Sequence, residues 1–159
     1  MTIYFLRHAS AGERLSDPAK DGKRPLDSTG SADAVRMGAL LAALEVRLDA
    51  IYSSPLKRAA QTASLAANEM GFEEKIQIEA ALAPGGGYAA FERLIDRDLG
   101  AIMVVGHNPT LSQFLGRMLG GVQIDLRKAG LARVELGRGG ASLEWVLTPK
   151  LARLLASMA

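Results

Sequence analysis

The sequence contains two histidines, and each stands at the end of a short apolar run. His8 closes the segment IYFLRH beside Arg7, and His107 directly follows AIMVVG. Apolar runs of this length, rich in β-branched and aromatic residues, are typical of buried strands. The carboxyl ends of parallel strands lie at one edge of a sheet, and open α/β sheets bind ligands at that edge. We therefore expect His8 and His107 to face one crevice, although they are far apart in the chain.

A third segment, IYSSPLKRAAQT, supplies further polar groups at the same edge. It places Ser53 and Ser54 at the end of a strand and Arg58 in the first turn of the following helix, off its apolar stripe. Ser54 is a candidate substrate ligand, although both serines can instead cap the helix. Arginine forks bind phosphate oxygens in pairs, and helix starts at Pro55 and Pro109 would offer free N–H donors. These groups predict an electropositive hollow suited to a phosphoryl group.

A neutral histidine can attack phosphorus and carry the phosphoryl group as a covalent phosphoimidazole that water then hydrolyses. Attack requires a free ring nitrogen aimed inward, and therefore an acceptor such as a backbone carbonyl on the other nitrogen. The transfer itself needs mainly positioning and neutralisation of charge on the phosphoryl oxygens. Two imidazoles among arginines would repel a cation, so we expect no metal site and no cofactor.

The three segments together resemble a known family. LRHA near the start, SSPLKRAAQTA in the middle and VVGHNPTL later are similar to the motifs of the histidine phosphatase (phosphoglycerate mutase-like) superfamily. The short length and RPLDSTG resemble its small phosphohistidine phosphatases of the SixA type. The resemblance implies that His8, beside Arg7, is the phosphorylated nucleophile and that Arg58 and His107 complete the phosphate pocket. It also places Arg24 at the pocket entrance, although Arg24 can equally be an ordinary loop residue, and Asn108 among the substrate ligands.

The chain departs from the family pattern at two informative positions. Ala9 replaces the glycine of the usual RHG, so the backbone there either needs no positive φ or has a shifted turn. Pro84 stands near the place where mutase-like members carry a general-acid glutamate, and Glu79 comes too early to match it. No side chain can then be assigned as the acid that protonates the leaving group, and His107 or water is the alternative donor. This gap favours phosphohistidine or another activated substrate over an alkyl phosphate.

Composition limits the remaining possibilities. The chain of 159 residues, 48% of them apolar, is long enough for one domain spanning residues 1–159. Its formal net charge is +2 with the basic residues scattered, so we expect no nucleic-acid partner and no membrane binding. The chain has no cysteine, and its N-terminal segment is charged too early for a signal peptide, so we expect a cytoplasmic protein. The sequence makes no prediction of oligomeric state.

Strand-like runs alternate with helical periodicity through most of the chain. We expect strands at 2–6, 49–53, 75–78 and 101–105, a hairpin at 130–137 and 141–148, and helices after residue 30, from 55, at about 88–97, from 109 and from 149. This order predicts a single-domain α/β three-layer sandwich with a mostly parallel sheet, an antiparallel C-terminal edge and helices on both faces. We expect Trp145 in the core, and Leu151, Leu154, Leu155 and Met158 on one face of the last helix.

The sequence therefore predicts a metal-independent phosphatase that works through phospho-His8. The resemblance to the SixA-type subgroup favours a phosphohistidine on a signalling or phosphotransfer protein as the substrate, and the chain has no long insertion that could form a lid over the crevice. One alternative is a phosphatase of small phosphate esters or anhydrides. The other is a non-catalytic phosphate-binding module, against which the combination of Arg7, His8, Arg58 and His107 argues.

Overall fold

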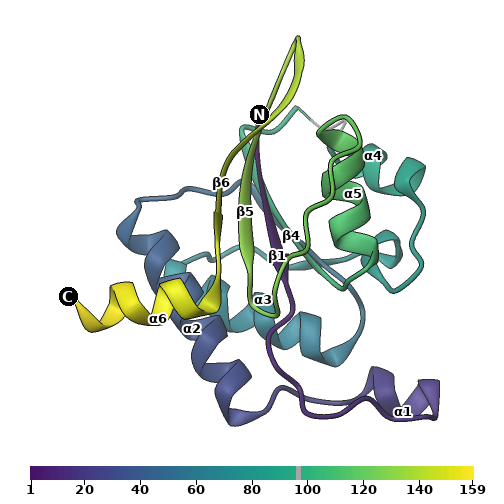
Figure 1. The fold of residues 1–159 in the computed structure, drawn as a ribbon, viewed down its shortest axis with the longest axis vertical. Coiled ribbons are helices and arrows are strands. Elements are labelled where there is room, and N and C mark those ends of the chain that lie inside the picture. The colour runs from purple at the N-terminus through teal and green to yellow at the C-terminus, as the bar shows by residue number, and fades with distance from the viewer. Residues whose placement is uncertain (96–97) are drawn as a thin grey trace.

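A six-stranded mixed sheet forms the middle of the computed structural model, which describes residues 1–95 and 98–159 (Figure 1). The strands lie in the order β3-β2-β4-β1-β5-β6. Their bounds are β1 Thr2–Arg7, β2 Ala50–Ser53, β3 Gln77–Ile78, β4 Ala101–Gly106, β5 Leu131–Gly137 and β6 Gly140–Leu147. Strands β1 to β4 are mutually parallel where they pair, whereas β5 runs antiparallel to both β1 and β6. The predicted parallel sheet with an antiparallel C-terminal edge is confirmed.

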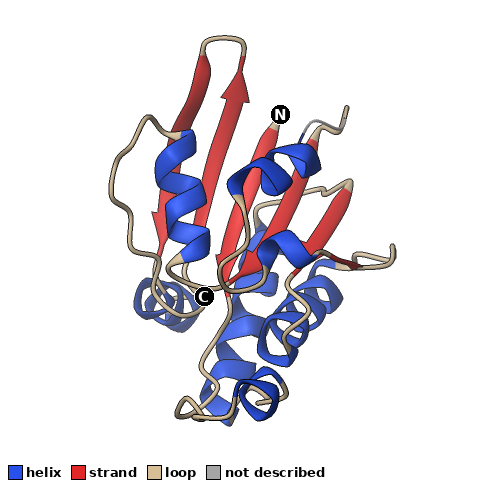
Figure 2. Ribbon diagram, turned by 90° about the vertical axis from the view of Figure 1, so that its right-hand side faces the viewer, coloured by secondary structure: helices blue, strands red, loops and turns tan. Residues whose placement is uncertain are grey.

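Helices cover both faces of the sheet and give the predicted three layers (Figure 2). Helices α2 (Ser28–Ala43), α3 (Lys57–Met70) and α6 (Pro149–Ser157) lie on one face, and α4 (Tyr88–Ile95) and α5 (Thr110–Met118) on the other. Successive side chains of a strand point to opposite faces, so β1 sends Ile3 and Phe5 to the α4–α5 side and Tyr4 and Leu6 to the α2–α3 side. Both faces of this central strand are therefore buried.

Most predicted elements are present, with shifted ends. Asp27 caps the start of α2, where its side chain accepts the N–H of Gly30. Helix α3 begins at Lys57 rather than Pro55 because Leu56 is still extended, and α5 begins at Thr110, after a cis peptide bond that precedes Pro109. The predicted strand at 75–78 is reduced to Gln77–Ile78. The expected end of α4 at residue 97 lies outside the described residues.

The C-terminal helix leaves most of its apolar residues exposed. Its leucines and Met158, predicted to share one face, are 43–75% exposed, and Ala152 is the residue that packs on the core. An ion pair from Arg153 to the buried carboxylate of Asp33 ties α6 to α2. The helix is thus held by a polar contact beside the sheet, and helical periodicity could not reveal which side would be covered. Trp145 is half-buried against the core beside Tyr4, in partial agreement with its predicted place.

Two short elements have no counterpart in the predictions. Helix α1 (Pro18–Gly22) lies beyond the carboxyl ends of the parallel strands, and the 3₁₀ turn η1 (Ala80–Leu82) leads from β3 toward α4 (Figure 1). Asp17 caps α1 and Pro18 occupies its first turn, which is a recognisable helix-start pattern. No helix in the described part of the chain is long and apolar enough to span a bilayer.

Candidate active site

The two histidines lie side by side at the carboxyl edge of the parallel strands. His8 follows β1 and His107 follows β4, its parallel neighbour, with Arg7 aligned to Gly106 in the register. The ring centroids are 4.9 Å apart, and both residues are buried, with 6% and 2% of their surface exposed. The predicted convergence of the two imidazoles is confirmed. It follows from strand pairing, which brings two strand ends together regardless of their separation in sequence.

One ring nitrogen of His8 is fixed by its own loop. Nδ1 lies 2.8 Å from the carbonyl oxygen of Ala9, and a carbonyl can only accept, so Nδ1 carries the proton. Nε2 is then unprotonated and carries a free lone pair. The N–H of Ala9 donates to Thr62 Oγ1, whose hydroxyl donates to the carbonyl of Arg58. Ala9 is fully buried without positive φ, so the departure from glycine needs no shifted turn.

The second histidine is oriented by Ser54. Nε2 of His107 lies 2.7 Å from Ser54 Oγ, which also accepts the N–H of Leu56. Among the described residues the Ser54 hydroxyl proton has no other acceptor, so it can be donated to Nε2. Nδ1 of His107 would then carry a hydrogen and act as a donor. Ser54 therefore acts both as a turn residue before α3 and as the partner of a site imidazole.

Both rings are neutral near pH 7. Burial, with a smaller contribution from the charges of Arg58 and Arg7, lowers the pKa of His8 to about 4, although the hydrogen bond to Ala9 acts in the opposite direction. Burial, together with neighbouring His8 and Arg58, lowers the pKa of His107 to about 3. A neutral imidazole with a free nitrogen is the form of histidine that can act as a nucleophile.

Arg58 lies in the same cavity but is not solvated. It is 6% exposed, and its guanidinium donates to the carbonyl of Asp21 at 3.0 Å and lies 3.4 Å from the Asp21 carboxylate. The Leu15 N–H, with Arg24 and Arg58, lowers the pKa of Asp21, so this carboxylate is ionised and anchors the arginine. Sequence reasoning missed Asp21 because it missed α1, although the Asp17–Pro18 pattern could have located that helix.

Arg24 is placed away from the cavity lining. Its Nε donates to Asp21 and its Nη1 to the carbonyls of Ala11 and Gly12, so it joins the loop after β1 to α1. The loop interpretation of Arg24 therefore fits the geometry better than direct contact at the pocket entrance. A cation that sequence reasoning did not name, the exposed Arg14, does line the cavity.

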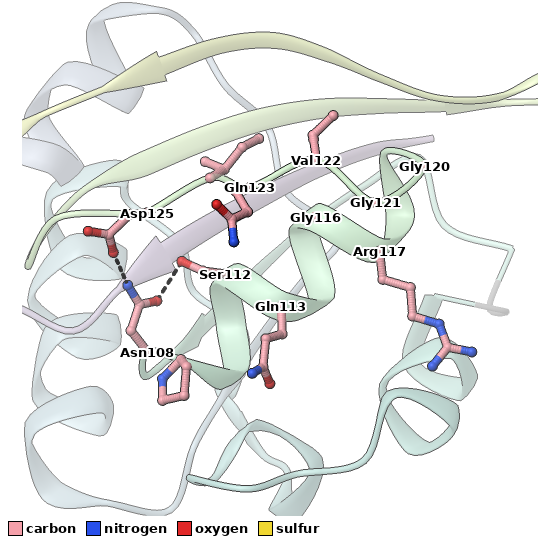
Figure 3. Close-up of a pocket in the computed structure, with 12 residues that line it drawn as sticks. Asn108, Ser112, Gln113, Gly116, Arg117, Gly120, Gly121, Val122, Gln123 and Asp125 are labelled. Carbon is pink, nitrogen blue, oxygen red and sulfur yellow. Dashed lines mark hydrogen bonds between the residues drawn. The ribbon is translucent and has the colours of Figure 1, made fainter.

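Arg7 and Asn108 both bind the segment before β5. Arg7 Nη1 donates to the carbonyl of Leu126, and Asn108 Nδ2 donates to that carbonyl and to Asp125. Figure 3 shows Asn108 between Asp125 and Ser112, whose hydroxyl donates to its side-chain oxygen. Both polar ends of the Asn108 amide are thus engaged within the protein. Asn108 borders the cavity, but its contacts suit a positioning role better than substrate binding.

The candidate site contains buried hydrogen-bond donors that have no partner within the protein. Among the described residues, four buried side-chain nitrogens lack a hydrogen-bond partner. Two of them, Arg58 Nε and His107 Nδ1, belong to residues that line the cavity, and a third, Arg7 Nε, belongs to the residue before His8. Buried polar atoms are normally paired, so a group of them at one place indicates a missing partner. The cavity, of about 860 Å³, has His8, Arg58 and His107 in its wall, together with Ala83 and Pro84 opposite α1. Its donors and positive charge suit a phosphoryl group.

The described lining provides no neutral carboxylic acid. Pro84 stands where the mutase-like pattern would place a glutamate, and Asp21, the one carboxylate in the described lining, is held ionised by its arginine partners. The described residues also contain no cluster of three or more His, Cys, Asp or Glu side chains able to hold a metal ion. The residues present can bind a phosphoryl group and attack it, but none is set up to protonate a strongly basic leaving group.

Comparison with known proteins identifies the family. A model of the histidine phosphatase superfamily (branch 1) matches residues 3–83, about half of the chain, which include His8 and Arg58. An uncharacterized protein from Picosynechococcus sp. is 35% identical over 145 residues, or 86% of each chain. The chain belongs to the histidine phosphatase superfamily. This membership confirms the resemblance carried by LRHA and SSPLKRAAQTA.

Solved structures of this superfamily share the fold over nearly the whole chain. The protein histidine phosphatase SixA, complexed with tungstate, has a TM-score of 0.82 and 22% identity, covering 94% of this chain and 98% of SixA. A candidate phosphohistidine phosphatase SixA from Agrobacterium tumefaciens has a TM-score of 0.79 and 27% identity over 93% and 98%. A candidate α-ribazole-5′-phosphate phosphatase from Escherichia coli has a TM-score of 0.73 and 19% identity over 94% and 98%. The fold is common to phosphatases of different substrates, so it does not select one.

Proposed function

We propose that this chain is a phosphohistidine phosphatase that removes a phosphoryl group from a protein through a covalent intermediate on His8. The observation that carries the proposal is the state of the His8 ring. The Ala9 carbonyl holds the proton on Nδ1, burial keeps the ring neutral, and Nε2 remains free beside His107. A free, neutral ring nitrogen beside two guanidiniums is suited to attack on phosphorus.

The first step would transfer the phosphoryl group between two ring nitrogens. Nε2 of His8 forms a bond to phosphorus while the bond from phosphorus to the substrate nitrogen breaks. Arg58, Arg7 and the Nδ1 donor of His107 would neutralise charge on the phosphoryl oxygens. In the second step, water attacks phospho-His8, inorganic phosphate leaves, and the ring returns to its starting state.

The leaving group supports phosphohistidine as the substrate. A phosphorylated imidazole that carries a proton on its other nitrogen departs as neutral imidazole, so no enzyme acid is required. An alkoxide is far more basic and benefits strongly from a general acid, which the described lining of this cavity lacks. The SixA proteins with the same fold, one of them named a protein histidine phosphatase, are consistent with this choice.

The test compares leaving groups on one peptide. A phosphohistidine peptide and the same peptide with phosphoserine at that position are assayed for phosphate release, with p-nitrophenyl phosphate as a small reference substrate. We expect kcat/KM for phosphohistidine to exceed that for phosphoserine by about 100-fold or more, the scale of a missing general acid. Equal turnover of the two peptides, or a preference for small esters, would contradict the proposed substrate.

The intermediate is tested separately. Quenching with a ³²P-phosphorylated substrate should trap an acid-labile, base-stable label on the wild type and none on His8→Ala. His8→Asn is the matched control, since its side-chain amide can still donate to the Ala9 carbonyl while offering no nucleophile. It should also lack the label. Label retained in either variant would place the nucleophile elsewhere.

A further inference from the structure

A second hollow, which we call the basic groove, lies on the same edge of the sheet as the candidate active site. It is formed where β1 ends, β5 begins and β6 passes into α6, and it has a volume of about 660 Å³. Its cationic lining residues are Arg7, Arg127, Lys128, Lys150 and Arg153. The chain as a whole carries a formal charge of only +2, so this part of the surface concentrates positive charge strongly.

The carboxylate in the described lining of the basic groove does not offset that charge. Asp33 is buried, and both Arg36 and Arg153 donate to it, so its negative charge is already matched by two guanidiniums. Arg127, Lys128 and Lys150 are exposed, and the nearby Asp125 is 4.0 Å from Arg127 at a fully open position. The lining also includes Ser10, Thr29 and Thr148, of which Ser10 donates its hydroxyl to Asp27. The groove therefore presents cations and hydrogen-bond donors to solvent.

The basic groove adjoins the catalytic cavity through β1. Arg7 lines the groove, and the next residue, His8, lines the cavity. The charge of Lys128 contributes to the low pKa of His8, and that of Arg127 contributes to the lowered pKa of Arg7, so both cations lie within electrostatic range of the site. A molecule large enough to hold a phosphoryl group at His8 and still cover neighbouring surface would extend onto these cations.

We propose that the basic groove docks an acidic face of the phosphorylated protein substrate beside its phosphohistidine. This inference rests on the proposed function, which puts the phosphoryl group on a protein. Cations spread over three elements and exposed to solvent suit several carboxylates on a surface rather than one compact anion. Of these cations Arg7 alone serves the phosphoryl group. Arg127, Lys128 and Lys150 line the groove and not the cavity, so they add selectivity for protein substrates without taking part in the chemistry.

The test uses two phosphohistidine peptides of equal length, one with four glutamates flanking the phosphohistidine and the other with four glutamines. The enzymes compared are the wild type, the groove variant Arg127→Glu/Lys150→Glu, and the control Arg47→Glu/Lys75→Glu. The control makes the same charge change at exposed positions near the opposite edge of the sheet, before β2 and β3. Lys128 and Arg153 are left intact because the first affects His8 and the second anchors α6.

The measured quantity is the ratio of kcat/KM for the acidic peptide to that for the neutral peptide within each enzyme, so any effect common to both peptides cancels. At low salt we expect a ratio of about ten in the wild type and the control, and of about one or less in the groove variant. Salt near ~0.5 M should bring the wild-type ratio toward one. A wild-type ratio of one, or a ratio that the groove variant leaves unchanged, overturns the docking inference alone. If neither peptide is hydrolysed while p-nitrophenyl phosphate is, the proposed function fails and the inference fails with it.

Discussion

The two buried neutral histidines should make the fold sensitive to mild acid. In the folded state the pKa values are lowered to about 4 for His8 and about 3 for His107, whereas an unfolded histidine titrates near 6.5. Between these limits the unfolded chain binds protons that the folded chain does not. Because the folded pKa values are the lower ones, stability is complete above about pH 6.5 and is lost as the pH falls.

The size of the effect follows from the pKa values. A pH of about 5 lies about 1.5 units below the unfolded histidine pKa of 6.5. Each unit corresponds to about 1.36 kcal/mol, so at this pH each ring lowers the free energy of unfolding by about 2 kcal/mol. The two histidines together should lower the free energy of unfolding by about 4 kcal/mol between about pH 7.5 and pH 5. Carboxylates with lowered pKa values, such as Asp21 and Asp27, act mainly at lower pH and do not mask this range.

Urea unfolding at constant ionic strength across this range measures the effect. The reference is His8→Asn/His107→Gln, in which the amides keep the hydrogen bonds to Ala9 and Ser54 but cannot titrate. We expect its loss of stability over the same range to be below about 1 kcal/mol, whatever its absolute stability. Tungstate or phosphate should reduce the wild-type loss, since a bound oxyanion favours protonated rings. A wild-type stability that is flat with pH, or a variant that retains the full slope, would refute the assignment of the two rings as neutral.

Three further outcomes follow from other contacts. Ser54→Ala should lower kcat by about 10- to 100-fold with little change in KM and alter the His107 ring-nitrogen NMR shifts. The adjacent Ser53→Ala should leave those shifts in place, because the Ser53 hydroxyl donates to the Ser54 carbonyl and not to His107. Asp21→Asn should raise KM for p-nitrophenyl phosphate several-fold, because the pocket guanidinium loses its charged anchor, and an unchanged KM would show that Asp21 is not needed. Phe91→Ala should lower the free energy of unfolding by about 3–5 kcal/mol in urea titrations, because the ring is fully buried and stacked 4.7 Å from another phenylalanine, and a loss below about 1 kcal/mol would contradict that packing.

The site could be located from sequence to the extent that topology decides it. A parallel sheet must place its strand ends together, so the apolar runs before His8 and His107 were enough to predict that their rings meet. The Ser53–Ser54 strand end and the off-stripe position of Arg58 led to the same edge. Short elements were harder to predict from the sequence than long ones. Helix α1 has only five residues, and the carboxylate that fixes Arg58 was missed with it.

The sequence by itself determined the layer order, the mostly parallel sheet and the identity of the histidine pair, because hydrophobic periodicity and strand ends are local properties of the chain. The tertiary structure decided the rest. Only the folded chain shows that the Ala9 carbonyl fixes the His8 tautomer, that Arg24 and Asn108 hold loops, and that the leucines of α6 are exposed. These properties depend on contacts between distant segments, and no pattern within one segment records which partner it will meet.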